Sequence, residues 1–128
     1  MANLTFSMEN YLEAVYELSL GGSGARVSDI AARLDVSKAS VNSAMNALHQ
    51  RGLVTNEKYR EIYLTEEGLN VAKVTAEKHH VLQTLLHQVM GVDEAQAFQD
   101  ACAMEHVISQ QSTDKIRSFL ADKGIDVM

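Results

Sequence analysis

Proline is absent from the sequence, and cysteine occurs only once, as Cys102. Because proline breaks helices, its complete absence fits a mostly helical chain. A single cysteine excludes an intramolecular disulfide, and an unpaired thiol belongs in a reducing compartment unless it serves as a ligand or a sensor. Cys102 therefore needs an explanation of its own.

Long apolar runs are also lacking. None approaches the ~20 residues that a membrane span needs, and no basic stretch followed by an apolar one begins at Met1. We therefore expect a soluble, unexported protein of the cytoplasm that has no membrane partner. The 128 residues, of which 46% are apolar, suffice for one domain or for two small subdomains that share a core.

An excess of positive charge is missing too, since the formal net charge is −6. Nonspecific affinity for phosphates comes from clustered Lys and Arg, so this balance argues against a nonspecific nucleic-acid binder. Within residues 1–70 the bases concentrate between Arg26 and Arg60. DNA would repel such a protein unless its charge or geometry were corrected, and bound divalent cations would do both.

The spacing of apolar residues predicts six helices. We expect them over residues 7–20, 28–34, 38–51, 65–90, 93–108 and 112–123. Ser7, Ser28 and Ser112 are the expected N-caps of the first, second and last helices. Two β-prone runs, 53–55 and 61–64, predict a β-hairpin after the third helix.

The expected fold class is mainly α with a small β-hairpin wing. Helix, tight turn, helix and hairpin follow one another between residues 27 and 64, in the order of a winged helix-turn-helix. We expect this DNA-binding domain to cover residues 1–70. Residues 71–128 are then expected to form a helical metal-binding and dimerisation domain.

The second helix of such a pair enters the major groove, and the hairpin tracks the DNA backbone. The expected DNA contacts are Arg26, Ser37, Lys38, Ala39, Ser40, Asn42, Ser43, Lys58 and Arg60. The plainer interpretation is that these side chains only solvate an exposed helix, but the order of the elements favours DNA. One module buries little surface, so we expect a homodimer that presents two recognition helices ~34 Å apart to a double-stranded operator. The apolar C-terminal helices are the available dimer surface.

Six residues form a candidate metal-ligand set. They are Asn10, Glu13, His79, Cys102, Glu105 and His106. Cys102, Glu105 and His106 fall at i, i+3 and i+4 of one expected helix, and so share a face within a single turn. Mixed nitrogen, oxygen and sulfur ligation suits Fe²⁺, Mn²⁺, Co²⁺ or Zn²⁺, bound as one cation or as two sharing bridging carboxylates. Taken singly, each residue also has an ordinary structural explanation, such as an inert buried thiol for Cys102.

On its sequence the chain resembles the diphtheria toxin repressor and manganese transport regulator family, in the short two-domain form. The segments that carry the resemblance are 7–13, 15–18, 26–31, 52–54, 57–60, 64–68, 78–80 and 105–109. The resemblance implies an iron- or manganese-dependent repressor of metal homeostasis genes that reads a palindromic operator as a homodimer. It also implies a metal site at the six candidate positions and no small-molecule substrate. Fe²⁺ or Mn²⁺ is the expected metal, and Co²⁺, Ni²⁺ or Zn²⁺ is expected to bind in vitro.

The resemblance leaves iron and manganese both open. Cys102 is similar to the iron-type members, whereas Glu13 is similar to the manganese-type members, and Asn10 replaces the Asp or Met that these types carry. The iron type has an ancillary metal site, but Gln83 and Phe98 stand at its positions here, which implies that this site is absent.

Two other classes of function compete with this one. A small zinc hydrolase is disfavoured, because the sequence contains no HExxH motif, glycine-rich phosphate loop or Ser/His/Asp arrangement. A winged-helix regulator that senses oxidation through Cys102 remains the alternative, and it would require a thiol of low pKa.

Overall fold

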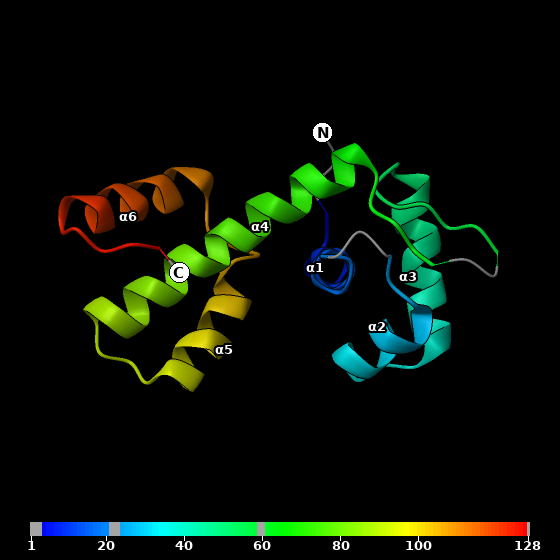
Figure 1. Cartoon of the computed structure of the whole chain (residues 1–128), viewed down its shortest axis with the longest axis horizontal. Helices are drawn as coiled ribbons and strands as arrows, with labels where there is room; N and C mark the ends of the chain where they lie inside the picture. The colour runs from blue at the N-terminus through cyan, green and yellow to red at the C-terminus, as the bar shows by residue number, and fades with distance from the viewer. Residues whose placement is uncertain (1–3, 21–23, 59–60, 128) are drawn as a thin grey trace. The chain divides into compact units, whose positions relative to one another are not determined.

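The computed structural model describes residues 4–20, 24–58 and 61–127 (Figure 1). It is mainly helical and divides into two compact units, Met1–Lys73 and Val74–Met128, here named the first unit and the second unit. The boundary falls inside α4 (Glu66–Thr84), which begins in the first unit and ends in the second. No helix within the described ranges is both long and apolar enough to cross a membrane.

Three helices of the first unit share one apolar core: α1 (Phe6–Leu18), α2 (Val27–Leu34) and α3 (Lys38–Gln50) (Figure 1). Each helix turns one face inward, because apolar residues recur every three or four positions. The most deeply buried side chains are Leu12, Val15, Ile30, Val41, Met45, Leu48, Val54 and Ile62. This core fixes which face of α3 remains exposed to solvent.

Two helix starts in the first unit differ from the prediction. The N-cap of α1 is Thr5 rather than Ser7, since Oγ1 of Thr5 accepts a hydrogen bond from the N–H of Met8 at 3.1 Å. The N-cap position of α2 is Arg26, without a side-chain hydrogen bond, and Ser28 lies inside the first turn. The apolar pattern locates both helices, but it does not select among the polar residues near their starts.

The turn between α2 and α3 follows the prediction. Asp35 ends α2 in the left-handed region (φ 54°), which Asp adopts more readily than most residues. Ser37 caps α3, because its Oγ accepts a hydrogen bond from the N–H of Ser40 at 3.0 Å. This turn sets the start of α3, where most of the expected DNA contacts lie.

The predicted β-hairpin is not seen as a pair of strands, although an antiparallel bridge joins its two runs. Within the described part of the chain no strand forms, and two isolated antiparallel bridges join Val54 to Leu64 and Ala25 to Ile62. Ile62 and Ala25 exchange two backbone hydrogen bonds, of 2.7 and 2.8 Å. The second β-prone run therefore pairs with two different segments. Backbone hydrogen bonds join Thr55 to Tyr63 at 2.8 Å and Thr65 to Leu53 at 3.0 Å, and Ile62 pairs with Ala25. Both runs are shorter than a typical strand, so neither pairing extends into a ladder.

The second unit contains the second half of α4 and three further helices. These are η1 (Leu85–Val89), α5 (Glu94–Met104) and α6 (Gln110–Asp122). The sequence predicts a regular helix to Met90, but after Thr84 the helix widens into a π turn, which the N–H of Met90 closes on the carbonyl of Leu85 at 3.0 Å. Gly91 (φ 77°) then ends the helix, as predicted. Single π turns occur frequently next to functional sites.

The helix α5 is shorter than predicted. It ends at Met104 rather than near Ile108, with Glu105 as its C-cap residue. The N–H of Glu105 still donates to the carbonyl of Ala101 at 2.9 Å, so the last turn is complete at Glu105. His106 lies in the turn that follows, rather than on the helix itself.

The start of α6 explains this early end. Its N-cap is Ser109 rather than Ser112, because Oγ of Ser109 accepts a hydrogen bond from the N–H of Ser112 at 3.0 Å. The helix α6 thus begins earlier than predicted, which leaves too little chain for α5 to reach Ile108. Gly124 (φ 69°) follows α6 as expected.

Candidate metal centre and nucleic-acid interface

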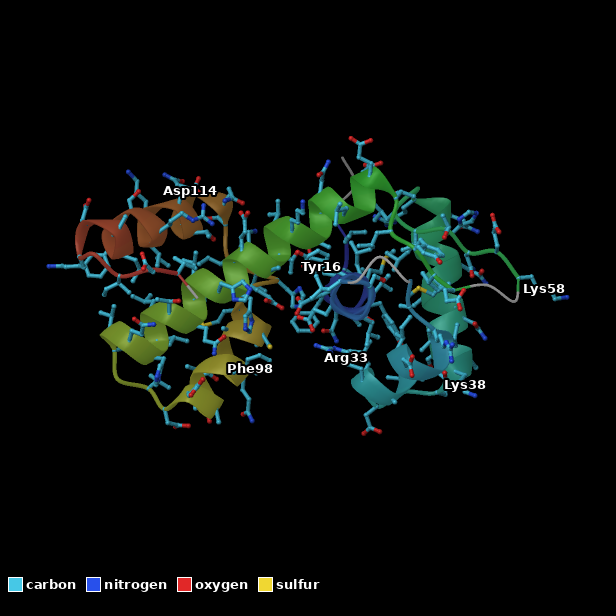
Figure 2. All side chains as sticks on the ribbon, in the orientation of Figure 1. Tyr16, Arg33, Lys38, Lys58, Phe98 and Asp114 are labelled. Atoms are coloured by element: carbon cyan, nitrogen blue, oxygen red, sulfur yellow. The ribbon has the colours of Figure 1, made fainter. Side chains whose placement is uncertain are left out.

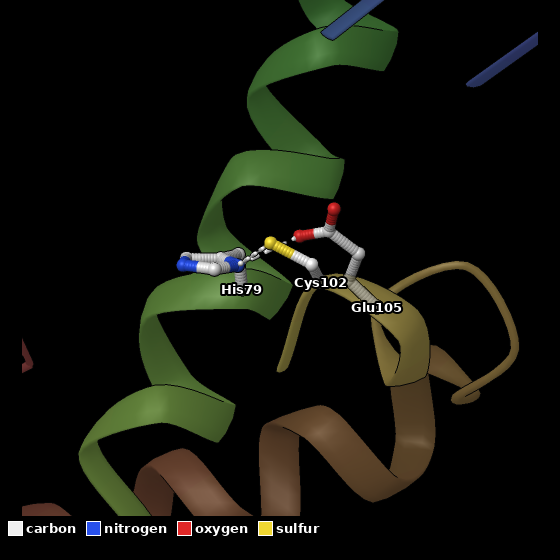
Figure 3. A group of neighbouring side chains, drawn as sticks. All are labelled: His79, Cys102 and Glu105. Carbon is white, nitrogen blue, oxygen red and sulfur yellow. Dashed lines mark hydrogen bonds and ion pairs between the residues drawn. The ribbon is translucent and has the colours of Figure 1, made fainter. Parts of the chain in front are cut away.

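Three potential metal ligands of the second unit lie close together (Figure 3). His79 comes from α4, Cys102 from α5, and Glu105 from the C-cap of α5. The Nδ1 atom of His79 lies 3.7 Å from Sγ of Cys102 and 3.2 Å from Oε2 of Glu105. One ligand atom from each residue lies within 4.8 Å of the other two. Figure 3 shows the three side chains directed toward one another from the two helices.

These side chains are largely removed from solvent. Glu105 is 2% exposed and His79 is 7% exposed, while Cys102 is half-buried. Burying a carboxylate is costly unless a cation or hydrogen-bond donors compensate for its lost hydration. A buried carboxylate between an imidazole and a thiol is therefore a candidate functional group rather than an ordinary core residue.

Glu105 also faces a second imidazole. Its Oε1 atom lies 3.4 Å from Nε2 of His106, whose side chain is 1% exposed. The two carboxylate oxygens are thus directed at His79 and at His106. The αR conformation of Glu105 continues the helical path past Met104 and keeps His106 beside it, although α5 has ended.

The donor chemistry fits a divalent transition metal. An imidazole nitrogen, a thiolate sulfur and a carboxylate oxygen form a mixed set of the kind that Fe²⁺, Mn²⁺, Co²⁺ or Zn²⁺ accepts. With Cys102 and Glu105 both deprotonated, two negative charges would lie side by side in a place shielded from water. A bound cation is the simplest way to balance them.

The other two expected ligands belong to α1 in the first unit. Asn10 and Glu13 lie one helical turn apart; Asn10 is exposed and Glu13 is half-buried. Their participation in a metal site stays a prediction from the sequence.

Further residues of the second unit surround the ring of His79. Oε1 of Gln83 lies 3.0 Å from its Nε2, and the ring of Phe98 packs edge-on against it, with the centroids 4.9 Å apart. The ring of His80 also meets it edge-on, at 5.6 Å. Partial burial, with a smaller electrostatic contribution from the neighbouring His79, lowers the pKa of His80 below its ordinary value of 6.5.

In the first unit, one face of α3 carries the expected DNA-reading residues. Val41, Met45 and Leu48 are buried in the core, and this orientation leaves the opposite face in solvent. The exposed residues at the start of α3 are Ser37, Lys38, Ala39, Ser40, Asn42 and Ser43. Small and hydrogen-bonding side chains of this kind let a helix approach base edges and phosphates.

A groove runs between α3 and the segment that follows it. Its polar and charged lining residues are Arg26, Ser28, Lys38, Asn42, Asn46, Asn56, Glu57, Lys58 and Glu61. Figure 2 shows Lys58 at the outer end of this segment, directed away from the helices. Arg60, the other expected cation of the wing, lies outside the described residues. The lining carries the basic groups of Arg26, Lys38 and Lys58 beside the carboxylates of Glu57 and Glu61, and the basic groups suit contact with a DNA backbone.

Two asparagines of this groove are missing from the sequence-based set. Nδ2 of Asn56 donates a hydrogen bond to Oδ1 of Asn46, which joins the segment after α3 to α3 itself. Asn46 follows Asn42 by one turn on the same exposed face, so helical periodicity was a usable signal for it. Asn56 gave no such signal, because its contact depends on how the intervening turn folds.

Comparisons with known proteins cover both units. Residues 3–62 match the family described as "Iron dependent repressor, N-terminal DNA binding domain". Residues 65–125 match the family described as "Iron dependent repressor, metal binding and dimerisation domain". The two matches follow one another along almost the whole chain.

Among similar proteins, the HTH-type transcriptional regulator MntR of Lysinibacillus sphaericus is 38% identical over 116 residues, which cover 91% of this chain and 83% of that protein. MntR of Bacillus subtilis is 38% identical over 112 residues, which cover 88% of this chain and 78% of that protein. Among solved structures, the manganese regulator SloR matches with a TM-score of 0.79 and 25% identity over 94% of this chain. The match covers 55% of SloR, so this chain spans about half of its length.

Proposed function

Because the chain belongs to the diphtheria toxin repressor and manganese transport regulator family, we propose that it is a metal-activated repressor that binds a palindromic operator as a homodimer. The genes under its control would be those of iron or manganese homeostasis. The observation that carries the proposal is the convergence of His79, Cys102 and Glu105 in the second unit, in a chain whose first unit exposes a DNA-reading helix face.

Family membership makes the chain a metal-dependent transcriptional regulator, and a DNA-binding protein rather than an enzyme. It also favours metal sensing over oxidation sensing through Cys102. The geometry supports the same preference, since a thiol sensor needs no buried carboxylate within ligand distance. A reduced thiol and a DNA target both fit the cytoplasm, which we propose as its location.

We assign His79, Cys102, Glu105 and His106 as the ligands that the second unit supplies. Bound there, a divalent cation supplies positive charge that offsets the two acidic ligands. Asn10 and Glu13 of α1 are proposed as further ligands, because they offer an amide and a carboxylate oxygen on one helix face.

Asn10 and Glu13 would also couple metal binding to DNA binding. The helices α1 and α3 pack in one core. A metal bound to side chains of α1 would therefore also restrain α3, the helix that carries most of the expected DNA contacts. Ligation would thereby favour the arrangement in which the two recognition helices of the dimer meet successive major grooves. Coupling of this kind is typically worth about 1–3 kcal/mol, or about 5–150-fold in affinity.

On the DNA side, we assign the residues by their chemistry. Asn42 has the amide that pairs with both the N6 and N7 positions of adenine, and is the proposed base reader. Lys38, Lys58 and Arg60 are proposed phosphate contacts, as is Arg26 at the groove wall. Ser37, Ala39, Ser40 and Ser43 are small enough to let the start of α3 enter the groove.

The metal itself is the least determined part of the proposal. The thiolate of Cys102 is a softer ligand than a carboxylate and favours iron or zinc over manganese. Glu13 and Glu105 are hard ligands that suit manganese. Similarity to the manganese regulator SloR favours manganese, so both metals have to be measured.

The deciding experiment selects DNA from a random duplex pool with the full chain and Mn²⁺, and then titrates the selected duplex with Mn²⁺, with Zn²⁺, and with Fe²⁺ without oxygen. We expect an inverted repeat to be enriched, and its affinity to rise with one of these metals. Binding that is equally tight in excess chelator would contradict metal activation.

A variant of Cys102 distinguishes metal sensing from the alternative, oxidation sensing. In Cys102→Ser, oxidation sensing predicts complete loss of regulation, whereas metal sensing predicts weaker but still metal-dependent DNA binding, because the nitrogen and carboxylate ligands remain. Insensitivity of this variant to chelator, with sensitivity of the parent chain to peroxide, would favour the alternative.

A further inference from the structure

We propose that Gln83 is a positioning residue of the metal centre: its side-chain carbonyl, 3.0 Å from Nε2 of His79, keeps the ring proton on Nε2 and turns the lone pair of Nδ1 toward Cys102 and Glu105. The inference rests on the proposed function, because it treats His79 as a ligand. It adds a residue outside the ligand set and gives it a specific task.

The contact itself is well enclosed. His79 and Gln83 stand one turn apart on α4, and they are 7% and 9% exposed. A neutral imidazole carries a proton on one nitrogen only, and a carbonyl oxygen can only accept. With Oε1 of Gln83 against Nε2, the proton belongs on Nε2. Nδ1, which lies nearest to the thiol and to the carboxylate, then keeps its lone pair.

A competing arrangement shows why this contact matters. Oε2 of Glu105 lies 3.2 Å from Nδ1, so the carboxylate would attract the ring proton to Nδ1. The amide of Gln83 would then have to turn over and donate to Nε2. A protonated Nδ1 has no lone pair for a metal. The amide oxygen of Gln83 therefore opposes the pull of Glu105 on this proton.

Phe98 supports the same orientation. Its ring packs edge-on against that of His79, and this contact hinders a half-turn of the imidazole that would exchange the positions of its nitrogens. Gln83 and Phe98 thus act on one ring from different helices, α4 and α5. Metal-binding histidines generally donate their second ring N–H to an acceptor, and loss of that acceptor typically weakens metal binding about 10–100-fold.

The first test needs no metal. The full chain, labelled with ¹⁵N in histidine and freed of metal by a chelator, is examined by long-range ¹H–¹⁵N correlation, and the signals of His79 are identified by their loss in His79→Gln. We expect the Nε2–H tautomer in the parent chain and in Gln83→Glu, which keeps an acceptor. Gln83→Leu should shift the ring toward the Nδ1–H form. An Nδ1–H ring in the parent chain would overturn the inference.

The second test measures affinity for Co²⁺ through the absorption of the thiolate–cobalt bond, without oxygen. We expect Gln83→Leu to weaken binding about 10–100-fold and Gln83→Glu to retain most of it. The matched control is Gln99→Leu, the same change at an exposed residue that lines the same pocket as Gln83. Equal affinity in Gln83→Leu and Gln99→Leu would remove the role of Gln83. If the parent chain takes up no Co²⁺, the proposed function fails, while the tautomer measurement still decides this inference.

Discussion

The two units bury different kinds of residue. Among the described residues, the buried polar or charged side chains all belong to the second unit: Thr75, His79, Gln83, Thr84, Glu105 and Thr113. The buried core of the first unit is apolar throughout, and those of its expected DNA contacts that the structure describes are exposed. Folding and the proposed function are therefore carried by separate residues in the first unit and by partly the same residues in the second.

This difference has a physical reason. A DNA-reading face must be reachable by a rigid duplex, so its side chains have to stand outside the core. A metal site gains from the reverse, because a shielded, low-dielectric place strengthens the interaction of ligands with a cation. Substitutions at the exposed DNA-reading face should therefore change function with little effect on stability. Substitutions at the buried metal site should change both.

The largest effect on the metal response is expected from Glu105→Ala. The change removes the carboxylate that faces both His79 and His106, and we expect the metal-dependent gain in operator affinity, about 5–150-fold, to disappear. Metal should also stop protecting the fold: at a concentration of about 100 Kd, it would stabilise the parent chain by ~2.7 kcal/mol. Thermal unfolding with and without Mn²⁺ measures this.

The matched control is Glu94→Ala, at an exposed residue at the start of the same helix. It should keep both the metal response and the operator affinity. Metal-dependent binding by Glu105→Ala at the level of this control would contradict the proposed ligand set.

The next effect tests the apolar core of the first unit. Leu48 is fully buried on the inner face of α3, so Leu48→Ala should lower the free energy of unfolding by about 2–5 kcal/mol. DNA affinity should fall with it, since the recognition helix loses its support. Under conditions in which the first unit of this variant is still folded, we expect the second unit to bind Co²⁺ as it does in the parent chain. Urea unfolding followed by circular dichroism gives the stability.

What the sequence predicts well also follows this division. Apolar periodicity locates every helix of the first unit, because each helix turns an apolar stripe to one core. The hairpin is not predictable in the same way, since Ile62 pairs with Ala25, a partner that only the folded chain brings near. The N-caps of α1 and α6 fall on Thr5 and Ser109, because several hydroxyl residues near each start compete for the role.

The site of the second unit is predictable only in part. The spacing of Cys102 and Glu105 suggests one cluster, but His79 is distant in sequence, and its place beside them depends on how α4 packs on α5. The role proposed for Gln83 could not be predicted from the sequence, where Gln83 is an ordinary helix residue. Only the structure shows its amide beside the ring of His79.

A smaller effect, confined to function, is expected from Asn42→Ala. The residue is exposed, so the free energy of unfolding should change by no more than about 0.5 kcal/mol. Discrimination at one base pair of each half-site should fall by about 1–3 kcal/mol, because the amide that reads adenine is gone. Affinities for operators that carry each of the four bases at every half-site position show this. Unchanged discrimination would remove Asn42 as a base reader.

The smallest effect is expected from Lys58→Ala, and it is visible mainly in the salt dependence of DNA binding. Lys58 is exposed at the outer end of the segment after α3 (Figure 2), where it is proposed to contact a phosphate. Loss of one phosphate contact should make the slope of log affinity against log salt concentration shallower by about 0.9 for each protomer, for specific and nonspecific DNA alike. Lys115→Ala, at an exposed residue of α6, is the control and should leave the slope unchanged. If both variants keep the parent slope, Lys58 does not contact the DNA backbone, and the proposed contacts that remain are those of α3, Arg26 and Arg60.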